Sequence, residues 1–242
     1  AIFGFLLIYG LALLVSMWRF LPSNTPQRTP GEAFWSGVFS RYRSVLKTRE
    51  AMGFLLLQGF CFSCMFVFLT ESTWVYKNYY GLSNKQYALA FMFNIVAMAS
   101  FNRLTAYRLK KGAQPHKILL SGLAVQFTTG LILAIWCLIA LPPFPVMVFL
   151  VMTTIGAQGL LVPSNQAIYM SYFSREAGSA NAVLGAGMQM IAFGIGWLTT
   201  EMHHITDGKI TVMPLMMFAS TLSAIAAIGL LSRNAFKAQR SQ

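Results

Sequence analysis

Acidic residues are scarce in this 242-residue chain, which has six Asp and Glu against 18 Lys and Arg. So few carboxylates offer no pair spaced for acid–base catalysis. Cysteine is rare as well: Cys61, Cys64 and Cys137 all lie in apolar segments, where a thiol packs as a small apolar group. A glycine-rich phosphate loop followed by Lys and Ser or Thr is absent, which argues against ATP hydrolysis. The sequence therefore predicts that the chain is not an enzyme.

Long apolar segments, by contrast, make up most of the chain, and hydrophobic residues account for 56% of it. Seven such segments cover residues 1–17, 52–73, 87–107, 118–141, 146–168, 180–202 and 212–231. Each is close to the ~20 residues that a helix needs to cross a bilayer. Because lipid offers no hydrogen-bond partners to the backbone, such spans must be helical. We therefore predict an all-α, multi-pass membrane protein.

Basic residues concentrate in alternate connections between these spans. The segments 18–51, 103–117 and 232–242, together with Arg175, hold 15 of the 18 Lys and Arg residues. The remaining connections hold only Lys77, Lys85 and Lys209. Positively charged connections stay on the cytoplasmic side, so the C-terminus is expected in the cytoplasm. The net charge of +12 then reflects topology and attraction to the lipid bilayer, and nucleic acid is not expected as a partner.

The pattern divides the chain into four parts. Residues 1–17 form a lone span that begins without Met inside an apolar run, so an upstream part of the same protein is expected to be missing. Residues 18–51 form a cytoplasmic linker, in which Trp35, Val38, Phe39, Tyr42 and Leu46 recur at helical spacing and predict an amphipathic helix at the membrane interface. Residues 52–231 form a block of six spans, and residues 232–242 form a cytoplasmic tail.

Polar side chains inside spans are costly, so each marks a candidate site. One interpretation is that the amides hydrogen-bond between packed helices. The other is that they line a cavity together with Met and aromatic side chains, which adapt their packing to large, partly apolar ligands. On the second interpretation the predicted substrate-binding residues are Gln58, Phe62, Met65, Asn94 and Gln158.

Four further positions carry specific predictions. Glu71, near the outer end of its span, either exchanges protons or faces water at the interface, and both possibilities stay open. Pro163 removes a backbone hydrogen bond within its span, which predicts a hinge or a kink. Gly185 is predicted to allow close packing between helices. Adjacent His203 and His204 come without a third ligand, so no metal site is predicted.

Short motifs occur along the chain in an order typical of one transporter family. They are Phe20-Leu21-Pro22, Gly81-Leu82-Ser83, Gly159 followed by Pro163 and Asn165, and the run AGSANAVLG at residues 177–185. In these motifs the chain resembles the major facilitator superfamily, and within it the Bcr/CflA-type multidrug efflux proteins of the drug:proton antiporter branch. The resemblance implies that residues 52–231 are the C-terminal six-helix bundle, and that the first span is the helix before it.

The resemblance also implies a function. The whole protein, with an N-terminal six-helix half, would export drugs or other small amphipathic compounds across a bacterial inner membrane by alternating access while protons flow inward. No cofactor is expected, because the proton gradient supplies the energy, and a monomer is expected. The alternatives are a facilitator for one metabolite, such as a sugar or nucleoside, and a membrane-embedded sensor without transport.

Overall fold

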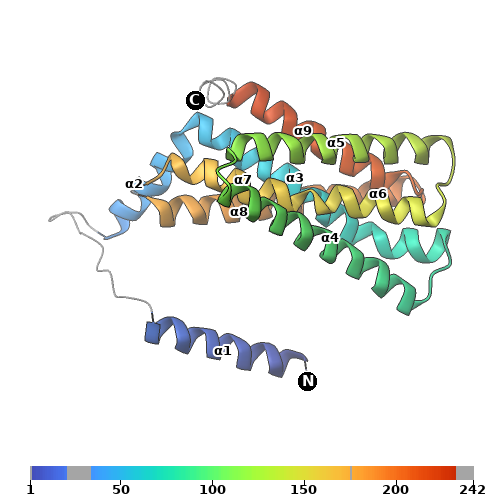
Figure 1. Cartoon of the computed structure of the whole chain (residues 1–242), viewed down its shortest axis with the longest axis horizontal. Helices are drawn as coiled ribbons and strands as arrows, with labels where there is room; N and C mark the ends of the chain where they lie inside the picture. Colours follow the sequence, from blue (N-terminus) through green and yellow to red (C-terminus); the bar gives the residue numbers. More distant parts are fainter. Residues whose placement is uncertain (1, 21–33, 175, 233–242) are drawn as a thin grey trace. The chain divides into compact units, whose positions relative to one another are not determined.

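The computed structural model of the chain describes residues 2–20, 34–174 and 176–232, and the regular structure in these ranges is helical (Figure 1). The helices are α1 (Ile2–Phe20), α2 (Phe34–Lys47), α3 (Arg49–Trp74) with a π-helical end η1 (Val75–Tyr79), α4 (Asn84–Lys110), α5 (Pro115–Ile139), α6 (Phe144–Gly156), α7 (Gln158–Ser171), α8 (Ala177–Ile205) and α9 (Val212–Leu231). Within these ranges, seven helical segments are long and apolar enough to cross a membrane. The predicted all-α membrane fold is confirmed.

The chain divides into two units, residues 1–38 and 39–242. In the first unit, α1 exposes every described side chain from Phe3 to Phe20. The predicted interfacial helix falls on α2, and its position at a membrane surface stays a prediction. The prolines of the linker and the tail from residue 233 lie outside the described residues.

The second unit is a helix bundle arranged around α3. Helices α7, α8 and α9 pack against α3, while α5 packs between α9 and the α6–α7 pair, and α4 covers α6 and α7. Two apolar clusters fill the bundle along α3. One surrounds Phe54 and Leu57 and the other surrounds Phe68 and Tyr76. Cys61 of α3 belongs to the first cluster, and its carbonyl accepts hydrogen bonds from two buried amide side chains.

The fifth predicted span is one membrane-length segment, Phe144–Ser171, in which α6 and α7 are joined at a single residue. Helix α6 ends at Gly156 and α7 begins at Gln158, so the break lies at Ala157, and Pro163 lies inside α7. Because proline has no N–H, the carbonyl four residues earlier, at Gly159, loses its helical donor. The Thr105 hydroxyl of α4 donates to this carbonyl at 2.8 Å. The acceptor that Pro163 frees is therefore used to join two helices.

Helices α4 and α7 cross at Gly159 with their backbones almost in contact. A Cβ atom at position 159 would overlap the Met98 carbonyl oxygen and come within 2.5 Å of the Asn102 amide nitrogen. Both groups belong to the α4 backbone, which cannot rotate away as a side chain can. The crossing therefore requires glycine at this position.

Gly159→Ala is expected to lower the stability of the bundle by about 3 kcal/mol, because α4 and α7 must separate to admit the methyl group. The measurement is the thermal unfolding of the purified protein in detergent. Gly229→Ala is the matched control, because nothing lies within 4 Å of a Cβ at that position. The control is expected to leave stability unchanged or to raise it by up to about 1 kcal/mol through helix propensity. Equal unfolding temperatures for the two variants would contradict the requirement for glycine where α4 and α7 cross.

Candidate functional site

Four buried amide side chains meet around one turn of α3, and we call them the central amide cluster. Its members are Gln58 of α3, Gln126 of α5, and Gln158 and Asn165 of α7. None is more than 4% exposed. Amides so deep in a membrane helix bundle must find hydrogen-bond partners within the protein.

Two members of the cluster share one acceptor. The side-chain Nε2 of Gln126 donates to the Cys61 carbonyl at 3.1 Å, and the Nε2 of Gln158 donates to the same oxygen. The two donors come from different helices, so this single carbonyl joins α5 and α7 to α3. Because Gln158 is the first residue of α7, the bond also fixes the position of the break between α6 and α7.

The other two members form a second link. The Nδ2 of Asn165 donates to the Phe54 carbonyl at 3.0 Å and to the Oε1 of Gln58 at 2.7 Å. The Nε2 of Gln58 in turn donates to the sulfur of Met188 on α8 at 3.4 Å. Gln58 therefore lies between α7 and α8, with its amide oriented by Asn165.

Three carbonyl oxygens of the cluster are buried acceptors without a donor in the part of the chain that the structure describes. They belong to Gln126, Gln158 and Asn165. A buried acceptor without a donor costs about 1–3 kcal/mol. The cluster can thus accept hydrogen bonds from water or from a polar group of a bound molecule.

The predicted substrate-binding residues are divided between the bundle interior and its surface. Gln58 and Gln158 meet in the central amide cluster. Asn94 lies apart from them on α4, 5% exposed, and its Nδ2 donates to the Ala90 carbonyl of its own helix. Phe62 and Met65 are half-buried on α3. The structure therefore buries two of the five residues along the same stretch of α3, where Gln58 bonds Asn165 and Gln158 bonds the Cys61 carbonyl, and their substrate role stays a prediction.

Phe62 and Met65 extend the cluster toward the surface of the bundle. Phe62 lies one turn after Gln58 and so on the same side of α3. Its ring packs on Phe66, with 5.9 Å between the ring centroids. Met188, the partner of Gln58, is half-buried as well. We call Phe62, Met65 and Met188 the α3–α8 rim.

Two important residues escaped the predicted site. Gln126 and Asn165 supply half of the central amide cluster, and neither was among the predicted substrate-binding residues. The available signal was an amide inside an apolar span, which is the same signal that marked Gln58. Gly185, predicted to pack closely, has nothing within 4 Å of a Cβ at its position in the described structure. Its packing role therefore stays a prediction.

Glu71 contacts His203 of α8 at the end of α3 that leads into η1. Its carboxylate is buried, 3% exposed, and its Oε2 lies 2.7 Å from Nδ1 of His203 on α8. The His203 ring packs edge-on against Trp74. The indole of Trp74 and the hydroxyl of Tyr79 both donate to the Gly208 carbonyl at 2.9 Å. These contacts join the ends of α3 and α8 to the turn before α9.

The position of Glu71 separates it from the α3–α8 rim. Glu71 follows Phe62 by nine residues, which on an α-helix is about 180° around the axis. Nine residues also place Glu71 about 13 Å along the helix from Phe62. Its contact with His203 lies near the C-terminal end of α8, beyond Met188. Within the described residues, no three His, Cys, Asp or Glu side chains come together in a way that could hold a metal ion.

A bundle of long apolar helices with an amide-rich centre is the architecture of a polytopic membrane protein, and comparison with known proteins identifies the family. The family model of the Major Facilitator Superfamily matches residues 1–197. The chain therefore belongs to this superfamily of membrane transporters.

Two curated relatives align with almost the whole chain. A "Bicyclomycin resistance protein homolog" of Haemophilus influenzae is 25% identical over 235 residues, which is 97% of this chain and 58% of the relative. An "Uncharacterized MFS-type transporter YdgK" of Bacillus subtilis is 26% identical over 234 residues, which is 95% of this chain and 54% of the relative. The chain thus spans little more than half the length of either relative.

Asn165→Leu is expected to lower stability by about 2 kcal/mol, because Gln58 Oε1 loses its donor inside the bundle. Asn102→Leu is the matched control, since Asn102 is exposed on α4 and makes no described side-chain hydrogen bond. Thermal unfolding in detergent measures both variants. If Asn102→Leu lowers the unfolding temperature as much as Asn165→Leu does, the central amide cluster does not stabilise the bundle.

His203→Ala is expected to lower stability by about 2 kcal/mol, because the buried Glu71 carboxylate is left without its partner. Adding Glu71→Gln to that variant is expected to recover part of the loss, since a neutral amide needs no counter-charge. His204→Ala serves as the control, because His204 is the exposed neighbour. The ion pair is unimportant if the double variant is no more stable than His203→Ala alone.

Proposed function

We propose that the chain is the C-terminal half of a proton-coupled exporter of drugs or other small amphipathic compounds. Membership of the transporter superfamily sets the class of activity. The printed name of the Haemophilus influenzae relative, a bicyclomycin resistance protein homolog that aligns with 97% of the chain, supports drug export. The N-terminal half of the same protein would supply the opposite wall of the substrate path.

The observation that carries this proposal is the combination of the α3–α8 rim with the central amide cluster. The rim presents two thioethers and one phenyl ring, which adapt their packing to ligands of different shape. Beside it, Gln58 adds a single oriented amide. A site with much apolar surface and few fixed polar groups suits amphipathic compounds. A facilitator selective for one sugar or nucleoside would need more fixed hydrogen-bond partners, because such partners reject analogues.

The cluster also bears on the mechanism. Transporters of this kind alternate access when one repeat rocks against the other around a fixed site. Because one carbonyl joins α3, α5 and α7, we propose that the described bundle moves as a single body. The rim then moves with the bundle and is presented to each side of the membrane in turn.

The proposal also includes the orientation of the protein in the membrane and the residue that couples transport to protons. We place the protein as a monomer in a bacterial inner membrane with the C-terminus in the cytoplasm, because the basic connections favour that side. Glu71, the proton-coupling candidate, lies nine residues from Phe62 along α3 and is bound to His203. We therefore propose that its role is structural, and that a carboxylate in the N-terminal half couples transport to protons.

Phe62→Ala and Met65→Ala in the whole transporter are expected to change the relative export of a panel of compounds by about tenfold for the bulkiest, because each removes apolar contact with the substrate. Gln58→Ala and Gln158→Ala are expected to change the same profile, provided that the proteins still insert. Export is measured in inverted membrane vesicles with and without a pH gradient.

Leu138→Ala is the control, because Leu138 is 61% exposed on α5, away from the rim. Glu71→Gln is expected to keep export that depends on the gradient. An unchanged compound profile in every rim variant would show that the α3–α8 rim does not contact the exported compounds. Uptake or release of a single metabolite without dependence on the gradient would favour the facilitator instead.

A further inference from the structure

The amide of Gln58 donates to a sulfur atom, unlike the other members of the central amide cluster. Its Nε2 lies 3.4 Å from Sδ of Met188 on α8, and no second acceptor for this nitrogen occurs in the described part of the chain. A thioether is a weak acceptor compared with a carbonyl or hydroxyl oxygen. Because Gln58 is only 4% exposed, bulk water does not supply a stronger one. The N–H groups of Gln58 are therefore poorly satisfied.

The orientation of this donor is fixed by the contacts behind it. The Nδ2 of Asn165 donates to the Phe54 carbonyl at 3.0 Å and to Gln58 Oε1 at 2.7 Å, which uses both of its hydrogens. If the Asn165 amide were turned over, its Oδ1 would face the Phe54 carbonyl oxygen, and two acceptors would meet. If the Gln58 amide were turned over, its NH2 group would face that of Asn165. The Nε2 of Gln58 is thus held toward Met188.

Helices α3 and α8 lie in close contact on both sides of this bond. A Cβ at Gly187 would lie 2.9 Å from the side chain of Leu55, and a Cβ at Gly59 would lie 2.5 Å from the side chain of Ile191. Each glycine is the sequence neighbour of one member of the bonded pair. The two helices are therefore packed together at this point, and the amide can change its acceptor through motion of the methionine side chain alone.

Met188 is suited to such a motion. It is half-buried, so its side chain extends from the Gln58 amide to the surface of the bundle. It is also unbranched, with three rotatable bonds, and such a side chain adapts its packing readily. Phe62 and Met65 complete the α3–α8 rim around it. The rim therefore offers apolar contact to a compound whose polar group reaches Gln58.

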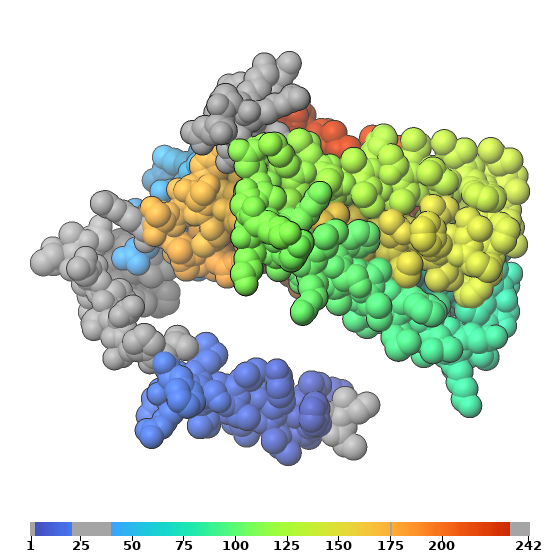
Figure 2. Space-filling view, in the orientation of Figure 1, coloured from blue at the N-terminus to red at the C-terminus, as the bar shows by residue number. Residues whose placement is uncertain are grey.

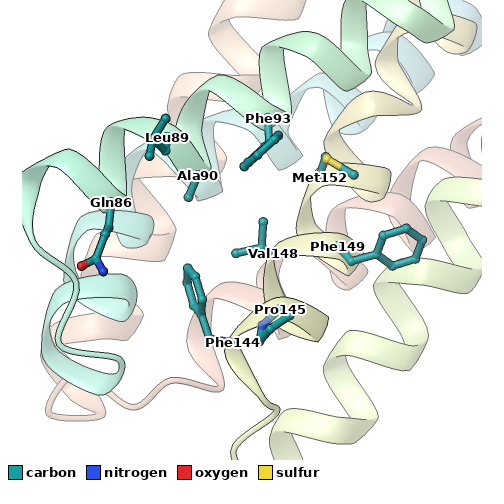
Figure 3. A pocket seen from close by; sticks show the side chains of 9 residues that line it. All are labelled: Gln86, Leu89, Ala90, Phe93, Phe144, Pro145, Val148, Phe149 and Met152. Atoms are coloured by element: carbon teal, nitrogen blue, oxygen red, sulfur yellow. The ribbon is translucent and has the colours of Figure 1, made fainter.

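The groove between α4 and α6 is a separate feature of the bundle, with a volume of about 450 Å³. On the face drawn in Figure 2, α4 in green and α6 in yellow lie next to each other. The groove is lined by Gln86, Leu89, Ala90 and Phe93 of α4 and by Phe144, Pro145, Val148, Phe149 and Met152 of α6 (Figure 3). None of these residues belongs to the central amide cluster or to the rim. A compound bound at the Gln58 donor therefore does not depend on this groove.

We propose that Met188 is a specificity-determining residue, whose thioether holds the Gln58 donor until a compound with an oxygen acceptor replaces it. The Gln58 N–H then bonds a carbonyl or similar oxygen of the compound, and the Met188 side chain turns aside to pack on its apolar part. The preferred compounds are amphipathic molecules that carry a strong oxygen acceptor within an apolar framework. This substrate class rests on the proposed export function, since both concern the same rim.

The test uses two tertiary-amine probes that differ at one group. One is a benzophenone with a para diethylaminomethyl substituent, and the other is its diphenylmethane analogue, in which a methylene replaces the ketone carbonyl. The half-saturating concentration for export by the whole transporter is measured for each probe in inverted membrane vesicles with a pH gradient. Vesicles without the transporter correct for passive partitioning. The preference ratio is the half-saturating concentration of the methylene probe divided by that of the ketone probe.

Gln58→Met removes the donor and keeps a flexible side chain of similar size, so its preference ratio is the reference for probes that differ only in partitioning. The wild-type ratio is expected to be about threefold above this reference, because the ketone replaces a weak acceptor with a stronger one. Met188→Leu removes the competing sulfur, and its ratio is expected to be about tenfold above the reference. Met65→Leu is the matched control, the same substitution at a rim residue without a described bond to Gln58, and is expected to keep the wild-type ratio.

A second measurement locates the bound ketone. Under ultraviolet light the excited carbonyl of the benzophenone takes a hydrogen atom from a nearby C–H group, and the two radicals then join in a covalent bond. Peptide mapping of the wild-type transporter is expected to find this adduct on the parts of α3 and α8 that carry Gln58 and the rim. Where a variant unfolds at a lower temperature than the wild type, the wild-type adduct map decides.

Equal preference ratios in the wild type, Met188→Leu and Gln58→Met overturn the role of Met188, and so does a Met65→Leu ratio that rises as much as that of Met188→Leu. An adduct that avoids the rim, or failure to export the ketone probe, has the same consequence. In each of these cases the proposed function stands if other compounds are still exported in dependence on the pH gradient. If no compound is exported in that way, the proposed function fails, and the substrate class fails with it.

Discussion

The backbone carbonyl of Cys61 is the point on which the arrangement of this bundle depends. Hydrocarbon supplies no hydrogen bonds, so the N–H groups of amides inside a membrane bundle need acceptors within the protein. Gln126 and Gln158 both donate to this oxygen, and each comes from a different helix. Apolar packing alone would let α5 and α7 slide along α3. The shared acceptor fixes the positions of α5 and α7 along the axis of α3. It thereby also fixes where Asn165 of α7 meets Gln58 of α3.

The broken span follows from the same constraint. Because α7 begins at Gln158, the amide that contacts Cys61 stands directly at the break. One residue later, Gly159 allows α4 to cross with backbone against backbone, and the carbonyl that Pro163 leaves free accepts from Thr105. The break, the crossing and the proline are therefore parts of one joint between three helices.

The sequence predicts the spans well and their contacts poorly, for physical reasons. Hydropathy is local, so seven apolar segments could be read directly. Interior amides could also be noticed, as Gln58 and Gln158 were, but their partners depend on how helices pack. Pro163 lies inside α7, and the hinge or kink predicted there stays a prediction. The Thr105 hydroxyl that donates to the Gly159 carbonyl comes from another helix and could not be read from the sequence. Glu71 and His203 are 132 residues apart, and only the fold brings them together.

Two faces of the bundle differ in the polar side chains that they carry. Along α3, the buried amides bond to the α3 backbone and, in the case of Gln58 and Asn165, to each other, and the half-buried α3–α8 rim lies beside them. Between α4 and α6, the exposed side chains are apolar apart from Gln86, which caps the start of α4. Because Tyr87 and Phe91 fill the side of α4 toward α3, the two faces share no side chain. The contacts of the two faces are thus separate in this fold, because a substitution on one face does not remove a side chain from the other.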